Sequence, residues 1–174
     1  MLPPLTVASC HAIVRDNLLR KGMDTMNEQF YTPAIAAKVT LVSEDIQRSL
    51  RSRFGEQWEH PIGVERNGRW LFSESDLIAL TSYGMHLANQ TSANQASHYA
   101  ALLRKGLNAD PNTDAVTITV GQPGDRMVVP AAVPFDALAK SRLSTVHFNL
   151  VINVAALRDH VRGMIAVATG ESKV

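Results

Sequence analysis

The chain has 174 residues, of which 45% are hydrophobic and 19% are charged, and its formal net charge is +1. This composition is typical of a globular fold of one domain or two small ones, and the near-neutral charge excludes a globally basic nucleic-acid-binding protein. A single cysteine, Cys10, excludes an internal disulfide; with no long apolar run and no signal-like start, we expect a cytoplasmic protein without a membrane segment.

Residues 1–30 are expected to form one helix and a connector. Apolar side chains between residues 5 and 22 fall broadly on one side of a helix, and Gly22 lies where that helix would end. Residues 23–30 then connect this helix to the next part of the chain, and we expect them to pack against it or against a partner chain.

A helix is predicted to begin at Pro33. Thr32 is a good N-cap, and proline suits the first helical position because its missing N–H costs nothing there. Ile35 and Val39 are four residues apart and therefore share one face of this helix.

A short turn separates this helix from a second one over residues 44–53, which Ser43 caps. Its first turn is acidic and its last turn carries arginines, as the helix dipole favours at each end. Ile46 and Leu50 are expected to face inward. Arg48, Arg51 and Arg53 are expected to face solvent or a ligand.

A short strand that runs directly into a capped helix is predicted over residues 67–77. Gly68 permits a turn conformation that most residues avoid, and Trp70 begins a bulky run that suits a strand. Ser73 is a good N-cap, and the Asp76 carboxylate follows three residues later at the helix N-terminus. A DNA-binding wing has this shape, but so has an ordinary hairpin that precedes a helix.

Two short motifs stand at a characteristic separation in these segments. They are Tyr31-Thr32, Ala37-Lys38, Thr40, Val42 and Ser43, then Asn67-Gly68 and Phe72-Ser73-Glu74-Ser75-Asp76-Leu77. Together they resemble the DNA-binding domain of MerR-type regulators and the related excisionase-like winged helices, over roughly residues 31–80, and the pair at this separation is moderately specific. The resemblance implies a winged helix-turn-helix fold that binds DNA.

The chain also departs from the family pattern. Leu41 stands where the family usually has glycine, although leucine does not readily take a left-handed conformation. The second helix reads Gln47-Arg48-Ser49-Leu50-Arg51 where the family usually has an arginine followed by paired aromatics. These differences fall where bases would be read, so the resemblance predicts no target sequence. The long coiled coil of typical members is not expected either, because no long heptad repeat follows.

The rest of the chain predicts two more helices and then a small α+β unit. Helices are expected over residues 76–89 and 96–107, and the polar segment 108–114 is a candidate linker. Beyond it the pattern predicts strands over 115–120, 127–130 and 145–154, and helices over 135–143 and 157–167.

The predicted fold class is therefore α+β. Residues 31–108 form a winged helix-turn-helix with following helices, and residues 115–174 form a hairpin, a helix, a strand and a helix. Three strands and two helices are too few to be securely stable alone, so we expect this unit to pack on the rest of the chain or on a second copy, as a dimerisation or regulatory unit.

The sequence carries little that is typical of an enzyme. Its six histidines form no ligand pattern of the kind that zinc sites use, so we expect no metal and no cofactor. The stretch Gly121–Asp125 resembles a phosphate loop only superficially, because it lacks the lysine and the helix that follow in such loops. We therefore expect a protein that is not an enzyme.

The functional hypothesis is a sequence-specific, double-stranded DNA-binding transcriptional regulator that acts as a homodimer. The helix from Ser43 to Arg53 would enter the major groove, with base edges read by Arg48, by Arg51 and, at adenine, by Gln47. Phosphates would be held by Arg53 and Lys38. The wing would meet the adjacent groove or backbone through Arg66, Asn67, Gly68 and Arg69.

Two alternatives remain open at this point. An excisionase-like or architectural factor of a mobile element would bend DNA at repeated sites. A protein-interaction adaptor would keep the winged fold without binding DNA, which the near-neutral charge and the altered second helix favour. A steep dependence of duplex affinity on salt would exclude the adaptor.

Overall fold

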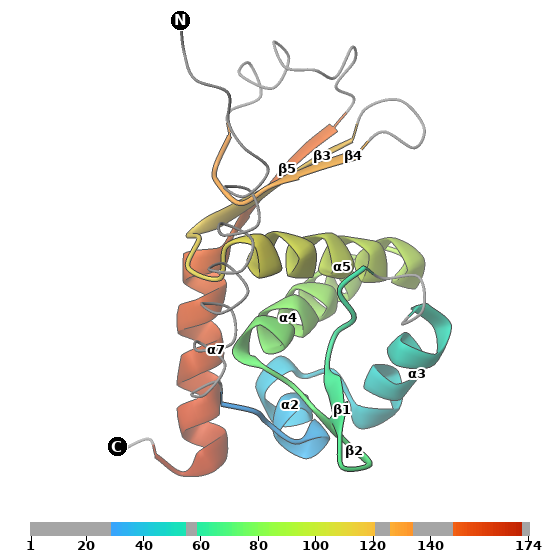
Figure 1. The fold of residues 1–174 in the computed structure, drawn as a ribbon, viewed down its shortest axis with the longest axis vertical. Coiled ribbons are helices and arrows are strands. Elements are labelled where there is room, and N and C mark those ends of the chain that lie inside the picture. The colour runs from blue at the N-terminus through green and yellow to red at the C-terminus, as the bar shows by residue number, and fades with distance from the viewer. Residues whose placement is uncertain (1–28, 55–58, 121–125, 134–147, 172–174) are drawn as a thin grey trace, which may run out of the picture.

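The computed structural model describes residues 29–54, 59–120, 126–133 and 148–171. Within these ranges the chain is α+β, with five helices, one two-stranded antiparallel sheet and one three-stranded antiparallel sheet (Figure 1). The helices predicted over residues 5–22 and 135–143 lie outside the described residues.

The first two described helices are α2 (Pro33–Thr40) and α3 (Glu44–Phe54). The predicted start of α2 is confirmed, since Pro33 is its first residue and the Thr32 hydroxyl accepts a hydrogen bond from the Ile35 N–H at 3.4 Å. Ser43 caps α3 in the same way, with its hydroxyl 3.4 Å from the Ile46 nitrogen. Leu41, in the turn between the helices, has a φ of 58°, so it adopts the left-handed conformation that glycine would take more easily.

A hairpin follows, made of β1 (Val64–Arg66) and β2 (Arg69–Leu71). Its two-residue loop is Asn67-Gly68, and both residues have positive φ, of 52° and 72°. Positive φ at both positions is the geometry of the tight turn that matches the twist of paired strands. Phe72, just after β2, pairs with Tyr31 through two backbone hydrogen bonds of 2.8 and 2.9 Å, which tie the hairpin to the start of α2.

Helix α4 (Glu74–Ala88) begins with the predicted cap at Ser73. The Ser73 hydroxyl accepts from the Asp76 N–H at 3.2 Å, and the Asp76 carboxylate accepts from the Ser73 N–H at 2.9 Å. The same buried carboxylate accepts a 2.7 Å hydrogen bond from Arg104 on α5 (Ala93–Ala109). One side chain thus starts α4 and also joins it to α5.

The three-stranded sheet has the order β4-β3-β5 and is antiparallel throughout. The prediction of β3 (Ala115–Val120) is confirmed, β4 (Arg126–Val129) begins and ends one residue before its prediction, and β5 spans Phe148–Asn153. Helix α7 (Val154–Thr169) begins earlier than predicted because the Asn153 side chain caps it, accepting from the Ala156 N–H at 2.9 Å.

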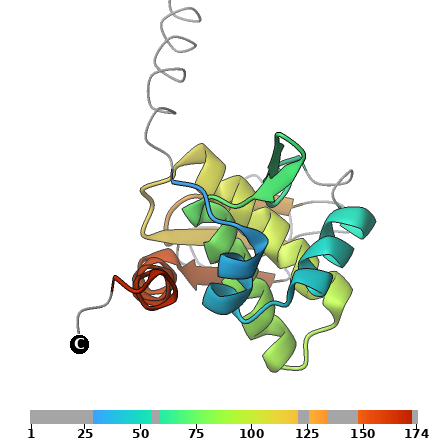
Figure 2. The same ribbon diagram turned by 90° about the horizontal axis from the view of Figure 1, so that it is seen from below.

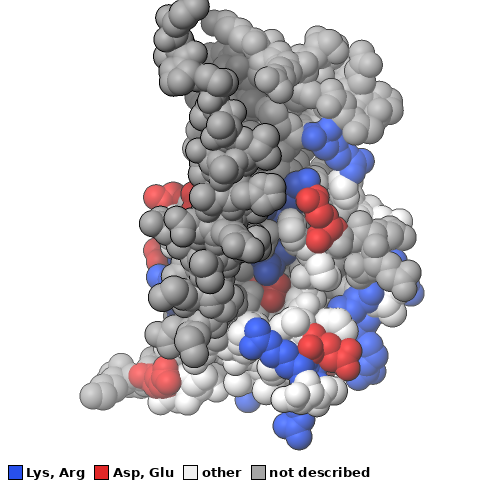
Figure 3. Space-filling model, in the orientation of Figure 1, with Lys and Arg blue, Asp and Glu red and all other residues white. Residues whose placement is uncertain are grey.

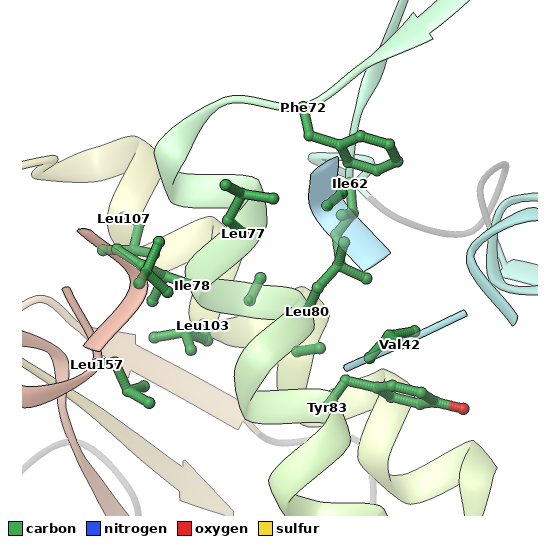
Figure 4. Close-up of a cluster of buried hydrophobic side chains, with 14 of the residues drawn as sticks. Val42, Ile62, Phe72, Leu77, Ile78, Leu80, Tyr83, Leu103, Leu107 and Leu157 are labelled. Carbon is green, nitrogen blue, oxygen red and sulfur yellow. The ribbon is translucent and has the colours of Figure 1, made fainter. Parts of the chain in front are cut away.

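One buried hydrophobic cluster draws residues from all five described helices and from β3 and β5 (Figure 4). It includes Leu77, Ile78 and Leu80 of α4, Leu103 and Leu107 of α5, and Leu157 of α7. The parts of the chain before and after the predicted linker 108–114 therefore share one core.

Helix α7 packs against α2 and α4, and polar contacts hold it there. Arg162 donates to Glu74 at 2.9 Å, and Arg158 donates to the backbone carbonyls of Pro111 and Thr113 at 2.8 and 3.1 Å. In the described part of the chain, none of the helices combines the length and the apolar character that a bilayer-crossing segment needs.

Candidate nucleic-acid interface

Helix α3 and the β1–β2 hairpin lie together on one side of the molecule. In both ribbon views they are separated from α7 by the body of the protein (Figures 1 and 2). Lys and Arg side chains gather toward the right and lower parts of the face in Figure 3, over these elements, with a few acidic side chains between them.

A groove of about 380 Å³ runs between α3 and the hairpin, and we refer to it as the α3–hairpin groove. Three of its lining residues are arginines, contributed by both elements, and one is acidic. The lining residues are Thr32, Pro33, Glu44, Arg48, Arg51, Arg69, Trp70 and Leu71. Positive charge thus predominates in a concave surface, where low-dielectric walls strengthen the field.

Arg51 lies against the wall of this groove. Its guanidinium carbon is 4.5 Å from the ring centroid of Trp70 and 5.6 Å from that of Phe72, within the range of a cation–π contact. Its Nη1 nitrogen is buried and has no hydrogen-bond partner among the described residues. Burial lowers the pKa of Arg51 from its ordinary value, and the neighbouring positive charge of Arg48 lowers it further. Arg51 therefore presents a partly desolvated cation whose charge no carboxylate in the described ranges neutralises.

Arg48 lies on the exposed face of α3. Its only ion pair in the described part of the chain is with Asp45, at 3.2 Å, and the two side chains are 73% and 89% exposed. Such an exposed pair is worth little in water, so it leaves Arg48 available to a ligand. Arg53 and Lys38 are also exposed, on α3 and α2 respectively.

The hairpin presents two more arginines beside its tip. Arg66 and Arg69 are exposed and lie directly opposite each other on β1 and β2. The Arg66 guanidinium lies 4.0 Å from the ring centroid of Phe30, which orders it without neutralising it. Asn67 and Gly68 form the exposed tip between them.

The role predicted for Gln47 is wrong. Its side chain is only 1% exposed, and its amide nitrogen donates to the backbone carbonyls of Val42 at 2.9 Å and Pro33 at 3.3 Å. Gln47 therefore joins the turn to the start of α2, and it is not available to an adenine.

The prediction that Ile46 and Leu50 form the inner face of α3 is correct for Leu50 and wrong for Ile46. Leu50 is buried as expected, but Ile46 is 38% exposed. Gln47 takes the inner position, where its amide nitrogen donates to two backbone carbonyls of the preceding helix and turn. The inner stripe of α3 consequently consists of Gln47, Leu50 and Arg51, which places Arg51 at the seam with the hairpin.

The aromatic partners of the arginines were not predicted from the sequence. Trp70 supports Arg51, and Phe30 supports Arg66. Neither pairing leaves a signal in sequence spacing, because each joins residues brought together only by the hairpin fold. Thr32 and Glu44, expected only as helix-terminal residues, also line the groove.

The described residues bring together no group of three or more His, Cys, Asp or Glu side chains that could hold a metal ion. The three arginines of the α3–hairpin groove offer hydrogen-bond donation and positive charge to an anion. No protein-family model matches this chain, and a comparison with curated proteins finds no significant relative.

Proposed function

We propose that residues 31–88 form a winged helix-turn-helix and that the protein is a sequence-specific, double-stranded DNA-binding transcriptional regulator. In this proposal α2 and α3 are the helix-turn-helix, α3 is the recognition helix, and the β1–β2 hairpin is the wing. The observation that carries the proposal is the α3–hairpin groove, which is lined by Arg48, Arg51 and Arg69 and by a single acid, Glu44.

The dimensions of α3 suit this role. Its 11 residues give a helix about 16 Å long, and a helix of about 10–12 Å diameter fits the DNA major groove, which is about 12 Å wide. Asp45, Arg48 and Ser52 are exposed on its outer face, and no described element covers them. Arg48 is the residue that we assign to a base edge, because arginine makes the commonest specific contact, with guanine.

The remaining predicted contacts are assigned to the DNA backbone. Arg53 on α3 and Lys38 on α2 would hold phosphates, while Arg66 and Arg69 would place the wing against the next stretch of backbone. Ser43 caps α3 and so fixes the direction in which the helix enters the groove.

Action as a homodimer belongs to the same proposal. Strand β5 is at one edge of the sheet formed by the described strands, and it carries no charged residue along Phe148–Asn153. Val151 on this strand is 48% exposed. An uncharged edge strand with an exposed apolar side chain is a surface that a second copy can extend.

Selection of bound fragments from a random pool of DNA duplexes tests the proposal. A regulator that binds as a homodimer enriches a two-fold symmetric site whose halves are spaced by a whole number of helical turns. Tandem, phased repeats would favour the architectural factor instead. If no fragment is enriched and no duplex is retained, the protein is not a DNA-binding regulator. The result would then favour the alternative of a protein-interaction adaptor that keeps the winged fold without binding DNA.

A further inference from the structure

Arg51 has a place in the α3–hairpin groove that differs from that of a base-reading side chain. Successive residues of a helix are about 100° apart, so Arg51 is about 40° around the helix from the buried Gln47 and about 60° from the exposed Arg48. It therefore faces the hairpin, whereas Asp45, Arg48 and Ser52 face outward.

The contacts of Arg51 restrict what it can bind. One face of its guanidinium is covered by Trp70 at 4.5 Å, so hydrogen bonding is left to the edge of the group. The Nη1 donor on that edge is buried and lacks a partner in the described part of the chain. A buried donor without an acceptor is costly, and it is more costly still on a charged group.

Two candidate acceptors beside Arg51 on α3 do not meet this need. The Oε1 atom of Gln47 is one helical turn away and is itself buried without a partner, but no hydrogen bond joins it to Arg51. Glu44 lines the groove, yet it forms no ion pair with Arg51. An acceptor from outside the protein would satisfy the donor and offset the mutual repulsion of three arginines.

We propose that the α3–hairpin groove is a phosphate site, in which the half-buried guanidinium of Arg51 turns its edge into the groove and donates to a phosphodiester oxygen of the DNA backbone. Arg69 flanks that oxygen from the hairpin side, and Arg48 faces outward toward the bases. Arginine suits this task because its planar fork matches phosphate geometry. This inference rests on the proposed function, and it replaces the base-reading role predicted for Arg51 with a contact that is independent of sequence.

The test compares wild-type protein, Arg51→Gln and Arg51→Lys on two labelled duplexes, the best site from the selection above and a scrambled duplex of equal length. Arg51→Gln is expected to weaken binding to both duplexes by the same factor, at least about tenfold. It is also expected to reduce the slope of log affinity against log salt by about 0.9, the effect of one lost phosphate contact. Arg51→Lys keeps the charge and is expected to retain most of the salt slope.

A matched control is Arg162→Gln, which removes one positive charge from α7, the helix that Figure 1 shows on the side of the molecule opposite α3. It is expected to change neither the affinity nor the slope. Thermal unfolding by circular dichroism is recorded for each variant, and affinities are measured well below the midpoint, so that a loss of binding is not a loss of fold.

Other outcomes would overturn the inference. If Arg51→Gln weakened binding only to the selected site and left the salt slope unchanged, Arg51 would be a base reader. If inorganic phosphate at constant ionic strength displaced the scrambled duplex at micromolar concentration, the groove would be a site for free phosphate. If wild-type protein bound no duplex at all, the proposed function would fail, and this inference with it; normal binding by Arg51→Gln would overturn only the inference.

Discussion

The guanidinium of Arg51 lies 4.5 Å over the ring of Trp70, so a cation from α3 and an aromatic side chain from β2 form one wall of the α3–hairpin groove. This contact joins the hairpin to the helix. It also holds a positive charge where the two elements meet, and the position of Trp70 therefore determines which way Arg51 faces.

Replacing Trp70 tests this relationship. Trp70→Leu is expected to lower the free energy of unfolding by about 1–2 kcal/mol, because it removes the cation–π contact and part of a half-buried apolar surface. It is also expected to weaken duplex binding although no charge is removed, since Arg51 is no longer held in place. Urea unfolding and fluorescence anisotropy measure the two effects.

Trp70→Phe is the matched control, because it keeps an aromatic face beneath the guanidinium. Its stability and affinity are expected to remain close to those of the wild type. Equal behaviour of the Leu and Phe variants would show that the aromatic ring does not position Arg51.

Leu41 offers a test of backbone strain in the turn between α2 and α3. Its φ of 58° is unfavourable for a residue with a Cβ, and its side chain is 84% exposed and so contributes little packing. Leu41→Gly is expected to raise the free energy of unfolding by about 0.5–1 kcal/mol. Leu41→Ala keeps the Cβ and is expected to give no such gain. The denaturant midpoint of Leu41→Gly is expected to exceed that of Leu41→Ala. The reverse order would show that the backbone at residue 41 is not strained.

Gly106 tests the packing of α5 on the sheet. A Cβ added there would lie 2.9 Å from both γ-carbons of Val116 and 3.2 Å from a γ-carbon of Val128. Since these contacts are too short for a packed core, Gly106→Ala is expected to destabilise the protein by about 1–3 kcal/mol.

The control for Gly106 is Gly163, which also lies within a helix. An added Cβ at Gly163 would meet nothing within 4 Å, so Gly163→Ala is expected to stabilise the protein by about 0.5–1 kcal/mol. Chemical denaturation measures both changes. If both alanine variants gained stability, α5 could not pack as closely against Val116 of β3 as the structure shows.

The stability of the protein is expected to fall as the pH drops below about 6.5. Burial lowers the pKa of His86 and of His98 from the ordinary value of 6.5, and the nearby Arg126 lowers that of His98 further. The unfolded chain thus takes up protons at a higher pH than the folded protein does. The contribution of these neutral histidines is complete above pH 6.5 and is lost as the pH falls through the lowered folded values.

Urea unfolding of the wild type and of the double variant His86→Gln/His98→Gln, between about pH 7.5 and 5, measures this dependence. The double variant is expected to lose less stability over the interval. Identical curves for the two proteins would show that other groups cause the acid sensitivity.

The elements of this fold that could be predicted from the sequence are those with local causes. Thr32-Pro33 and Ser73 begin α2 and α4 through caps made within one turn of the chain, and Asn67-Gly68 makes the hairpin through its own backbone. Each of these signals depends only on residues close together in the sequence, so the sequence is enough to predict it.

The orientation of α3 could not be predicted in this way. Its apolar residues favour an inner stripe through Ile46 and Leu50, but Gln47 is drawn inward by carbonyls of Pro33 and Val42. One of these partners is 14 residues away, so the cause is tertiary. The packing of α7 onto α4 also depends on residues far apart in the sequence, since Arg162 and Glu74 are separated by 88 positions.

The candidate site was predictable in its residue types and not in its geometry. Arg48, Arg51 and Arg69 stand out as charges on the helix and hairpin, and they do line one groove. The half-burial of Arg51 against Trp70 follows from how the hairpin is anchored, through the pairing of Phe72 with Tyr31. No spacing along the chain encodes that contact.

The most direct test of the central claim, that the arginines of α3 and the hairpin meet duplex DNA, is the salt dependence of duplex affinity. Wild-type protein is compared with the double variant Arg53→Gln/Arg69→Gln and with Arg162→Gln on α7. The account predicts a steep negative slope for the wild type, an unchanged slope for Arg162→Gln, and a slope shallower by about 1.8 for the double variant, which loses two phosphate contacts. Duplex binding that is absent, independent of salt, or unaffected by the double variant would contradict the account.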